Sequence, residues 1–394
     1  KAMCVQKNMA TITGAVDVNS TGAYVLTYSV SDGAGNEANA TRTVNVGMAA
    51  TYVVEGASNL QMLWVEPGTF TMGSPTSEAG RETNEAQHNV TLTKGFYLGK
   101  YEVTQAQYEA VMTGNTNTLE ALNNPATPSQ FANNPNRPVE RVHWNNIQVF
   151  LTRLNAAEQA AGRLPAGWQY VLPTESKWEY ACRAGATTVY SWGNSIAASN
   201  ANYSSSAINQ TRDVGQYAAN PWGFFDMHGN VFEWTADRYA ISYPTGSATD
   251  PIGPTTGSSR VQRGGSWFST ASDARSAIRS GSEPAYRNKI LGFRVGFRYA
   301  GGVSQLSLLG DANATHVGGM AWVDPGFTAT DAEDGNLTSQ VTVTGAVNAN
   351  ATGTYVLHYT VMDSKGNIAA TTRTVNVSMA ATRVVEGASN LQML

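Results

Sequence analysis

Two segments near the ends of this 394-residue chain are copies of one another. Residues 14–63 and residues 345–394 are identical at 36 of 50 positions when they are aligned at a constant offset of 331. A repeat of this length predicts that a small β module occurs twice, with one large domain between the copies. The chain is therefore expected to be organised as a tandem array of domains.

The second copy alternates apolar and polar side chains, which is typical of strands with one buried face. Apolar or aromatic side chains occupy every second position of its first stretch, at Tyr355, Leu357, Tyr359 and Val361. Residues 374–377 repeat the pattern after a polar turn at residues 363–367, so the sequence predicts a β-hairpin. With the turn-rich residues 323–338 ahead of the hairpin, residues 304–378 resemble a bacterial immunoglobulin-like surface repeat.

The copies at the two ends of the chain are incomplete. Residues 14–46 correspond only to the second half of the β module, and residues 380–394 correspond to the start of the large domain. Two explanations remain open: the chain is a fragment of a longer array, or the apolar strand at residues 390–394 pairs with a neighbouring chain. The expected domains are a partial immunoglobulin-like module over 1–47, a large domain over 48–300, an immunoglobulin-like module over 304–378 and the start of a further repeat over 379–394.

Charge and hydropathy argue against nucleic acid as a partner and against a membrane span. The chain has 25 Lys and Arg against 29 Asp and Glu, and this net charge of −4 without a basic patch does not favour nucleic acid. No apolar run of about 18 residues occurs, which excludes a membrane span within this sequence. No signal peptide opens the chain, although an exported precursor remains possible. The cysteines, Cys4 and Cys182, are too few for a disulfide framework.

Three helices are expected in the large domain. Residues 104–107 fit a capping box and predict a helix that ends near Gly114. The second helix has apolar side chains at helical spacing, at Ile147, Phe150, Leu151 and Leu154. The third begins at Thr174 and ends by Gly185 in a left-handed cap. Residues 186–260 have few periodic runs, so buried aromatic side chains or a cation must organise them.

Several motifs of the large domain follow one another in a fixed order. They occupy residues 62–74, 97–104, 137–139, 172–180, 223–234, 263–269 and 291–294. In this order, over roughly residues 59–299, they resemble the sulfatase-modifying factor family, which includes the formylglycine-generating enzymes. The resemblance implies an α+β fold, the formylglycine-generating-enzyme variant of the C-type-lectin-like fold, flanked here by all-β immunoglobulin-like sandwich modules.

The resemblance also implies an active site whose chemical residues have been replaced. Family enzymes hold Cu(I) with two cysteines and oxidise a sulfatase cysteine to formylglycine, but those positions are Ser269 and Ala274 here. Copper is not expected, because a serine oxygen is a hard ligand and alanine offers no donor. The family tryptophan beside the oxygen pocket is Phe232, whereas the pocket serine is retained as Ser266. Cys182 is a single thiol and cannot replace two.

A structural calcium site is a second implication of the resemblance. The matching positions are Asp226, Gly229, Val231 and Glu233, which would bind through two side chains and two backbone carbonyls. All donors would be oxygen atoms, as a hard cation prefers. The alternative is that the carboxylates of Asp226 and Glu233 only cap or pair locally.

These observations favour a non-catalytic domain in a secreted or cell-surface bacterial tandem protein. It would act in ligand binding or as a structural or adhesive unit, with a cell-surface protein, a glycan or neighbouring repeats as partners. The candidate surface combines Trp222–Phe225 with exposed aromatic and arginine side chains, namely Trp267, Arg275, Arg279 and Tyr286. A structural role for Arg279 and Arg294, as anchors of carboxylates, is the alternative. The competing functional hypothesis is an active formylglycine-generating oxidase.

Overall fold

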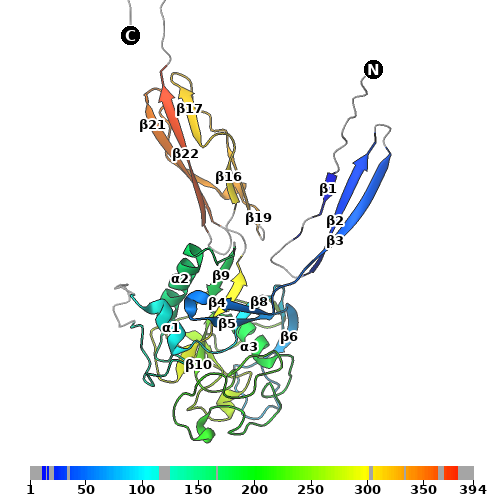
Figure 1. The fold of residues 1–394 in the computed structure, drawn as a ribbon, viewed down its shortest axis with the longest axis vertical. Helices are drawn as coiled ribbons and strands as arrows, with labels where there is room; N and C mark the ends of the chain where they lie inside the picture. Colours follow the sequence, from blue (N-terminus) through cyan, green and yellow to red (C-terminus); the bar gives the residue numbers. More distant parts are fainter. Residues whose placement is uncertain are drawn as a thin grey trace, which may run out of the picture. The chain divides into compact units, whose positions relative to one another are not determined.

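The computed structural model describes residues 11–14, 16, 22–32, 36–114, 125–165, 167–300, 305–331, 334–362 and 368–379. The chain divides into two units, Lys1–Pro165 with Gln169–Arg298, and Ala166–Trp168 with Tyr299–Leu394. Strands predominate in both, and the α-helices of the described residues all belong to the first unit (Figure 1). The predicted domain boundaries stay a prediction.

The N-terminal part of the first unit is a three-stranded antiparallel sheet. Its strands are β1 (Thr11–Thr13), β2 (Gly22–Ser31) and β3 (Glu37–Val46). Strands β2 and β3 pair over their whole length, from Gly22 opposite Val46 to Ser31 opposite Glu37.

The central region of the first unit contains three further sheets. The first has the order β4-β5-β8-β15-β9, made of Thr51–Val54, Leu60–Val65, Phe96–Gly99, Gly296–Tyr299 and Trp168–Val171. The second has the order β13-β12-β10-β14, made of Arg279–Ser282, Arg260–Arg263, Phe232–Arg238 and Leu291–Phe293. The third has the order β11-β7-β6, made of Ala248–Thr249, His88–Leu92 and Gly68–Met72. Residues distant in sequence thus meet in each sheet.

The three expected helices form where the local signals place them. Helix α1 (Gln105–Met112) begins after Thr104 with the predicted capping box. Helix α2 (Trp144–Ala160) buries the predicted apolar face, and helix α3 (Glu175–Arg183) is capped by Thr174. The left-handed end of α3 comprises both Ala184 and Gly185.

An apolar core joins helix α3 to two of the sheets. Its buried members come from β5 to β8, from α3 and from the loop before β10, and include Met72, Val90, Leu98, Trp178 and Phe224. Burying large side chains on α3 fixes the charged residues of the same helix beside β12. This packing positions the candidate site.

The second unit contains two sheets. One has the order β16-β18-β19, made of Gln305–Leu308, Phe327–Asp331 and Gly335–Asn336. The other has the order β17-β22-β21-β20, made of Asn313–Val317, Ile368–Ser378, Gly353–Met362 and Thr342–Thr344. Strands β21 and β22 form the predicted hairpin, whereas its turn at residues 363–367 and the copied segment 380–394 lie outside the described residues.

A polar anchor lies inside the second unit. The guanidinium of Arg373 on β22 is fully buried and bonds the carboxylate of Asp324. The hydroxyl of Tyr359 on β21 donates to the same carboxylate. A buried arginine is tolerated here because a carboxylate neutralises it.

Candidate functional site

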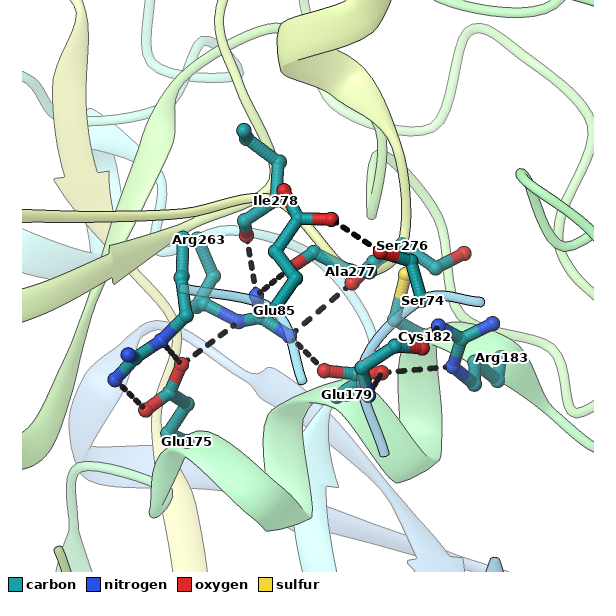
Figure 2. A network of polar contacts seen from close by, with 12 residues as sticks. Ser74, Glu85, Glu175, Glu179, Cys182, Arg183, Arg263, Ser276, Ala277 and Ile278 are labelled. Carbon is teal, nitrogen blue, oxygen red and sulfur yellow. Dashed lines mark hydrogen bonds and ion pairs between the residues drawn. The ribbon is translucent and has the colours of Figure 1, made fainter. Parts of the chain in front are cut away.

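A cluster of buried, oppositely charged side chains holds α3 against β12 and the loop that follows it (Figure 2). Arg263 is fully buried and bonds Glu179 of α3. Its guanidinium also donates to the carbonyl oxygens of Ala277, at 2.8 Å, and Ser276, at 3.1 Å. Arg183 donates to the other oxygen of Glu179 at 2.8 Å. Each charge in this part of the core therefore has an opposite charge within contact distance.

Arg275 and Arg279 belong to the same cluster, so the prediction that these two side chains are exposed is wrong. Arg275 pairs with Glu78 and Glu85, in both cases at 2.7 Å, and Arg279 pairs with Glu175 at 2.7 Å. The two arginines are only 1% and 3% exposed. The structural alternative for Arg279 is confirmed. We call the set the Arg263 cluster; its four arginines and four glutamates are Arg183, Arg263, Arg275, Arg279, Glu78, Glu85, Glu175 and Glu179.

A second buried ion pair joins β10 to the end of β14. Arg294 is fully buried and pairs with Glu233 at 2.8 Å, which confirms its structural interpretation. It also donates to the carbonyl oxygen of Gly99 at 2.8 Å. The carboxylate of Glu233 accepts a further hydrogen bond from the indole nitrogen of Trp178, at 2.8 Å. Both oxygens of Glu233 are thus already engaged.

Glu102 is a buried carboxyl group that the sequence analysis missed. It accepts hydrogen bonds from the backbone nitrogen of Val231 at 3.0 Å and from the side-chain amide of Asn230 at 2.6 Å. Asp226, which lies in the same loop as Asn230 and Val231, accepts a hydrogen bond from the backbone nitrogen of Gly215 at 2.6 Å. The only sequence signal for Glu102 is a lone acid between an aromatic and a β-branched residue, at the end of a motif.

Carboxyl groups outnumber the arginines around Glu233, where Arg294 pairs with Glu233 and Arg212 acts on Asp226. We call this set the Glu233 cluster; it comprises Glu102, Asp226, Glu233 and Arg294. Burial raises the pKa of Glu102 well above its ordinary value, and the carboxylates of Asp226 and Glu233 raise it further. Burial also raises the pKa of Asp226 to about 6. A divalent cation would neutralise such an excess.

The loop expected to bind calcium, residues 226–233, runs through this cluster. Asp226 and Gly229 have left-handed backbones, with φ of 57° and 89°. A Cβ atom at Gly229 would lie 2.3 Å from the carbonyl oxygen of Asn202, so only glycine fits. A small, partly open pocket is lined by Asp226 and His228. These features bring the predicted residues into one region.

The donor set has the oxygen chemistry of a calcium site. Among the described residues, no group of three or more His, Cys, Asp or Glu side chains could hold a metal ion. The predicted set has two carboxylates, so the backbone carbonyls of Gly229 and Val231 would have to supply the other donors. The buried excess of carboxyl groups fits a hard cation, which would share Glu233 with Arg294. Calcium stays a prediction.

The two positions that hold cysteines in the family enzymes, Ser269 and Ala274, are buried and carry no thiol. Ser266 and Ser269 form a tight turn in which the hydroxyl oxygen of Ser269 accepts from the backbone nitrogen of Ser266 at 3.0 Å, and the two hydroxyl oxygens lie 3.2 Å apart. Ala274 is fully buried. Phe232, at the start of β10, is half-buried. This turn offers oxygen atoms only, which are poor ligands for Cu(I).

Cys182 does not supply the missing sulfur. Its thiol lies 3.6 Å from Nε2 of His228, and Nδ1 of that histidine lies 2.7 Å from the carbonyl oxygen of Ala274. Burial raises the pKa of the Cys182 thiol to about 12 and lowers the pKa of His228 to about 4. Both groups are therefore neutral at physiological pH, and the thiol is not a thiolate ligand.

The prediction that the aromatic side chains of the candidate surface are exposed is confirmed for Tyr286 and wrong for Trp267. Trp267 is buried, at 4% exposure, and its indole nitrogen donates to the carbonyl oxygen of Lys289. Its neighbour Phe268 is 68% exposed, and Tyr286 is 43% exposed. Trp267 therefore supports the surface from below, while Phe268, which the sequence analysis missed, presents an apolar ring to solvent. In a tight turn, successive side chains point in different directions, which sequence spacing does not reveal.

Comparison with known families identifies the two kinds of domain. Residues 50–298 match the sulfatase-modifying factor enzyme 1-like domain, which is more than half of the chain, so the chain belongs to this family. Residues 5–46 and 306–377 match the bacterial surface protein Ig-like domain. The family resemblance read from the motifs is confirmed.

Individual relatives agree with this assignment. The chain is 26% identical over 290 residues to the formylglycine-generating enzyme of Mus musculus, covering 59% of this chain and 74% of the relative. It is 32% identical over 242 residues to the serine/threonine-protein kinase pkn1 of Chlamydia caviae, covering 59% of this chain but only 37% of the kinase.

Two solved structures share the fold of the large domain. Treponema denticola variable protein 1 matches with a TM-score of 0.53 and 27% identity, over 63% of this chain and 98% of that one. PvdO from Pseudomonas aeruginosa matches with a TM-score of 0.54 and 26% identity, over 64% and 100% of the two chains. No helix of the described residues has the length and apolarity to cross a membrane.

Proposed function

We propose that the large domain is a non-catalytic member of its family that binds a ligand on its surface. The main support is the absence of thiols at the two positions that would hold copper. Ser269, in the Ser266–Ser269 turn, offers only a hydroxyl oxygen, and Ala274 offers no donor. The exposed ring of Phe268, within that turn, and the exposed ring of Tyr286 support a binding role. The same scaffold would thus serve recognition, without redox chemistry.

Calcium is part of this proposal as a structural ion. Asp226 and Glu233 would hold it with the carbonyl oxygens of Gly229 and Val231, and it would offset the excess negative charge of the Glu233 cluster. We also propose that the large domain is a variant of the C-type-lectin-like fold. The support for this description is the family resemblance of the motifs at residues 62–74, 172–180 and 263–269.

The immunoglobulin-like modules support a location at the bacterial surface or outside the cell. Both flank the large domain in sequence and match a bacterial surface domain. In this arrangement the modules would space and display the large domain, and a cell-surface protein or a glycan would be its partner. Neighbouring repeats would contribute a structural or adhesive role.

The decisive experiment compares oxidase activity with binding. The purified chain is incubated with Cu(I), oxygen and a peptide that carries a sulfatase cysteine motif, and mass spectrometry measures formylglycine. In parallel, the chain is applied to glycan and cell-surface protein arrays. We expect no aldehyde, and at least one ligand whose signal falls in Phe268→Ser. Aldehyde formation would establish the oxidase, whereas blank arrays without aldehyde would leave a purely architectural role.

A further inference from the structure

We propose that one face of the N-terminal sheet binds the first half of an immunoglobulin-like module. The occupant is an extended apolar segment with an aspartate, of the kind that residues 305–341 form in the second unit. We call this surface the Arg42 face; its members alternate along β2 and β3 and are Leu26, Tyr28, Val30, Arg42, Val44 and Val46. None of these residues belongs to the ligand surface proposed for the large domain, so the two proposals are independent.

The repeat provides a second copy of the same hairpin, which can be followed in Figure 1 beside the first. Strands β2 and β3 pair with Gly22 opposite Val46, and β21 and β22 pair with Gly353 opposite Val377. Both pairs are related by the offset of 331 that relates the sequences, so the two hairpins have the same register. The counterparts of the Arg42 face are Leu357, Tyr359, Val361, Arg373, Val375 and Val377.

In the second unit, the first half of the module covers these counterparts. Val361 belongs to an apolar cluster with Ala329 of β18 and Leu337, and Leu306 of β16 packs against that cluster. The ring of Phe327 packs edge-on against the ring of Tyr359, with centroids 5.4 Å apart. All six counterparts are buried. This face of the hairpin is therefore part of a core when a segment such as residues 305–341 lies on it.

The same positions are uncovered in the N-terminal sheet. Val30 is 36% exposed, whereas its counterpart Val361 is 2% exposed. Arg42 is exposed, whereas Arg373 is fully buried. The remaining apolar and aromatic members of the Arg42 face are only half-buried. Adjacent apolar side chains that are left accessible on one sheet face mark a docking surface.

The opposite face of the same strand is alike in the two copies. Val25 of β2 is 52% exposed, and its counterpart Val356 of β21 is 40% exposed. Both valines alternate with the residues of the covered face and point away from it. The difference between the copies is therefore confined to the face that the first half of the module covers.

The charge on the Arg42 face specifies an aspartate on the occupant. The guanidinium of Arg373 bonds the carboxylate of Asp324 and donates to the carbonyl oxygens of Leu309 and, at 3.2 Å, Gly326. All three partners belong to the first half of the module. Asp324 lies outside the repeated segment, so the copy of the arginine in β3 comes without a copy of its partner. An incoming carboxylate would pair with Arg42 as the two are buried together.

The edge of the N-terminal sheet provides backbone groups for the same occupant. Strand β17 pairs in parallel with β22, from Asn313 opposite Thr374 to Val317 opposite Ser378. In the described part of the N-terminal sheet the order is β1-β2-β3, which places β3 at an edge. An edge strand offers unpaired N–H and C=O groups to an added strand. The occupant would thus add a parallel strand beside residues 43–47.

The test uses the full chain and a fluorescein-labelled synthetic peptide with the sequence of residues 305–341. Fluorescence polarisation should show saturable binding of this peptide and none of a shuffled peptide of the same composition. Val30→Thr should weaken binding about tenfold, because it buries a hydroxyl group without a partner. The matched control Val25→Thr, on the opposite face, should leave the affinity unchanged. Threonine suits a strand, so both variants should keep the hairpin.

A double-mutant cycle tests the ion pair. Arg42→Gln in the chain and Asp324→Asn in the peptide should each weaken binding at least about tenfold, because each leaves one buried charge without its partner. Together they should weaken it little more than either change alone, since both remove the same interaction. Phe268→Ser should leave peptide binding unchanged, which separates this face from the ligand surface of the large domain.

Three results would overturn the proposal. The first is equal binding of the shuffled peptide, and the second is a fully additive effect of the two charge substitutions. The third is a dimer of the chain alone, measured by light scattering, that Arg42→Gln dissociates, because the Arg42 face would then belong to a second copy of the chain.

Discussion

The two buried charge clusters of the large domain differ in balance. The Arg263 cluster matches four arginines with four glutamates, and each arginine lies within salt-bridge distance of a partner. In the Glu233 cluster Arg294 pairs with Glu233 and Arg212 acts on Asp226, yet the pKa values of Glu102 and Asp226 are raised. A balanced cluster can hold a loop-rich region together by itself, whereas an unbalanced one needs protons or a cation.

This difference assigns the Arg263 cluster a structural role and leaves the Glu233 cluster as a potential ion site in the same domain. In the Arg263 cluster, the Arg275 and Arg279 side chains lower the pKa values of Glu85 and Glu175 against the opposing effect of burial. In the Glu233 cluster, the effect of burial on the pKa values of Glu102 and Asp226 is larger than the opposing effect of the nearby arginines, Arg294 for both acids and Arg212 for Asp226. The outcome depends on the number of opposite charges at contact distance, and burial alone does not decide it.

Removing an arginine from the balanced cluster should have the largest effect. Arg263→Met leaves the fully buried carboxylate of Glu179 with Arg183 as its charged partner and with one hydrogen bond from the backbone nitrogen of Gly73. Breaking one partner of a buried ion pair costs roughly 3–5 kcal/mol. Urea unfolding followed by tryptophan fluorescence measures the change.

The control for this prediction is Arg42→Met, on the exposed side of β3, which should change the free energy of unfolding by less than about 0.5 kcal/mol. If Arg263→Met unfolds at the same urea concentration as the original chain, the cluster does not hold the domain together.

Adding calcium should have the next largest effect, on the unbalanced cluster. An ion that binds only the folded chain stabilises it by about 2.7 kcal/mol when its concentration is about a hundredfold above Kd. Differential scanning calorimetry should show a higher melting temperature with calcium than with a chelator. Asp226→Asn should abolish the increase, because it removes a charged donor and part of the excess charge.

Two controls accompany the calcium measurement. Asp311→Asn, an exposed substitution in the second unit, should leave the calcium effect unchanged. Magnesium should stabilise less, because it requires a stricter octahedral geometry. An identical melting temperature in calcium and in chelator would remove the ion from the proposal.

The smallest expected effect is a loss of stability as pH rises, from Asp237, a buried acid that accepts a hydrogen bond from the backbone nitrogen of Glu175 in the balanced cluster. Burial raises the pKa of Asp237 to about 7, and the carboxylate of Glu175 raises it further. The folded chain therefore holds a proton that the unfolded chain has lost, so stability is highest below about pH 4 for this group and falls through about pH 7. Between pH 5.5, where the measurement starts, and about pH 7, the loss is about 2 kcal/mol at most, since each pH unit contributes about 1.4 kcal/mol.

Asp237→Asn provides the measurement for this group. The free energy of unfolding of the original chain should decline between pH 5.5 and pH 8, and the decline should be smaller in the variant. Glu140, whose pKa burial also raises to about 7, should account for part of the remaining slope. Parallel curves for the original chain and Asp237→Asn would show that this carboxyl group is ionised in the fold.

Much of the site could be predicted from the sequence, because its motifs combine local signals with fixed chemistry. The replacement of thiols at Ser269 and Ala274 follows from the family resemblance without coordinates, and the same resemblance implies a calcium loop from Asp226 to Glu233, which stays a prediction. The burial of Arg275 and Arg279 was not predicted. Their partners Glu85 and Glu175 are 190 and 104 residues away in sequence, so only the folded chain brings them together.

The repeat shows what sequence alone determined and what tertiary structure decided. The segment Thr-Arg-Thr-Val-Asn-Val occurs in both β3 and β22, and both copies form the strand that their alternating side chains predict. Yet Arg42 is exposed, whereas Arg373 is fully buried against Asp324. Alternation is a local property of the backbone and specifies the strand. Burial of a charge depends on a carboxylate from a distant segment, and that partner is supplied only when the surrounding strands assemble.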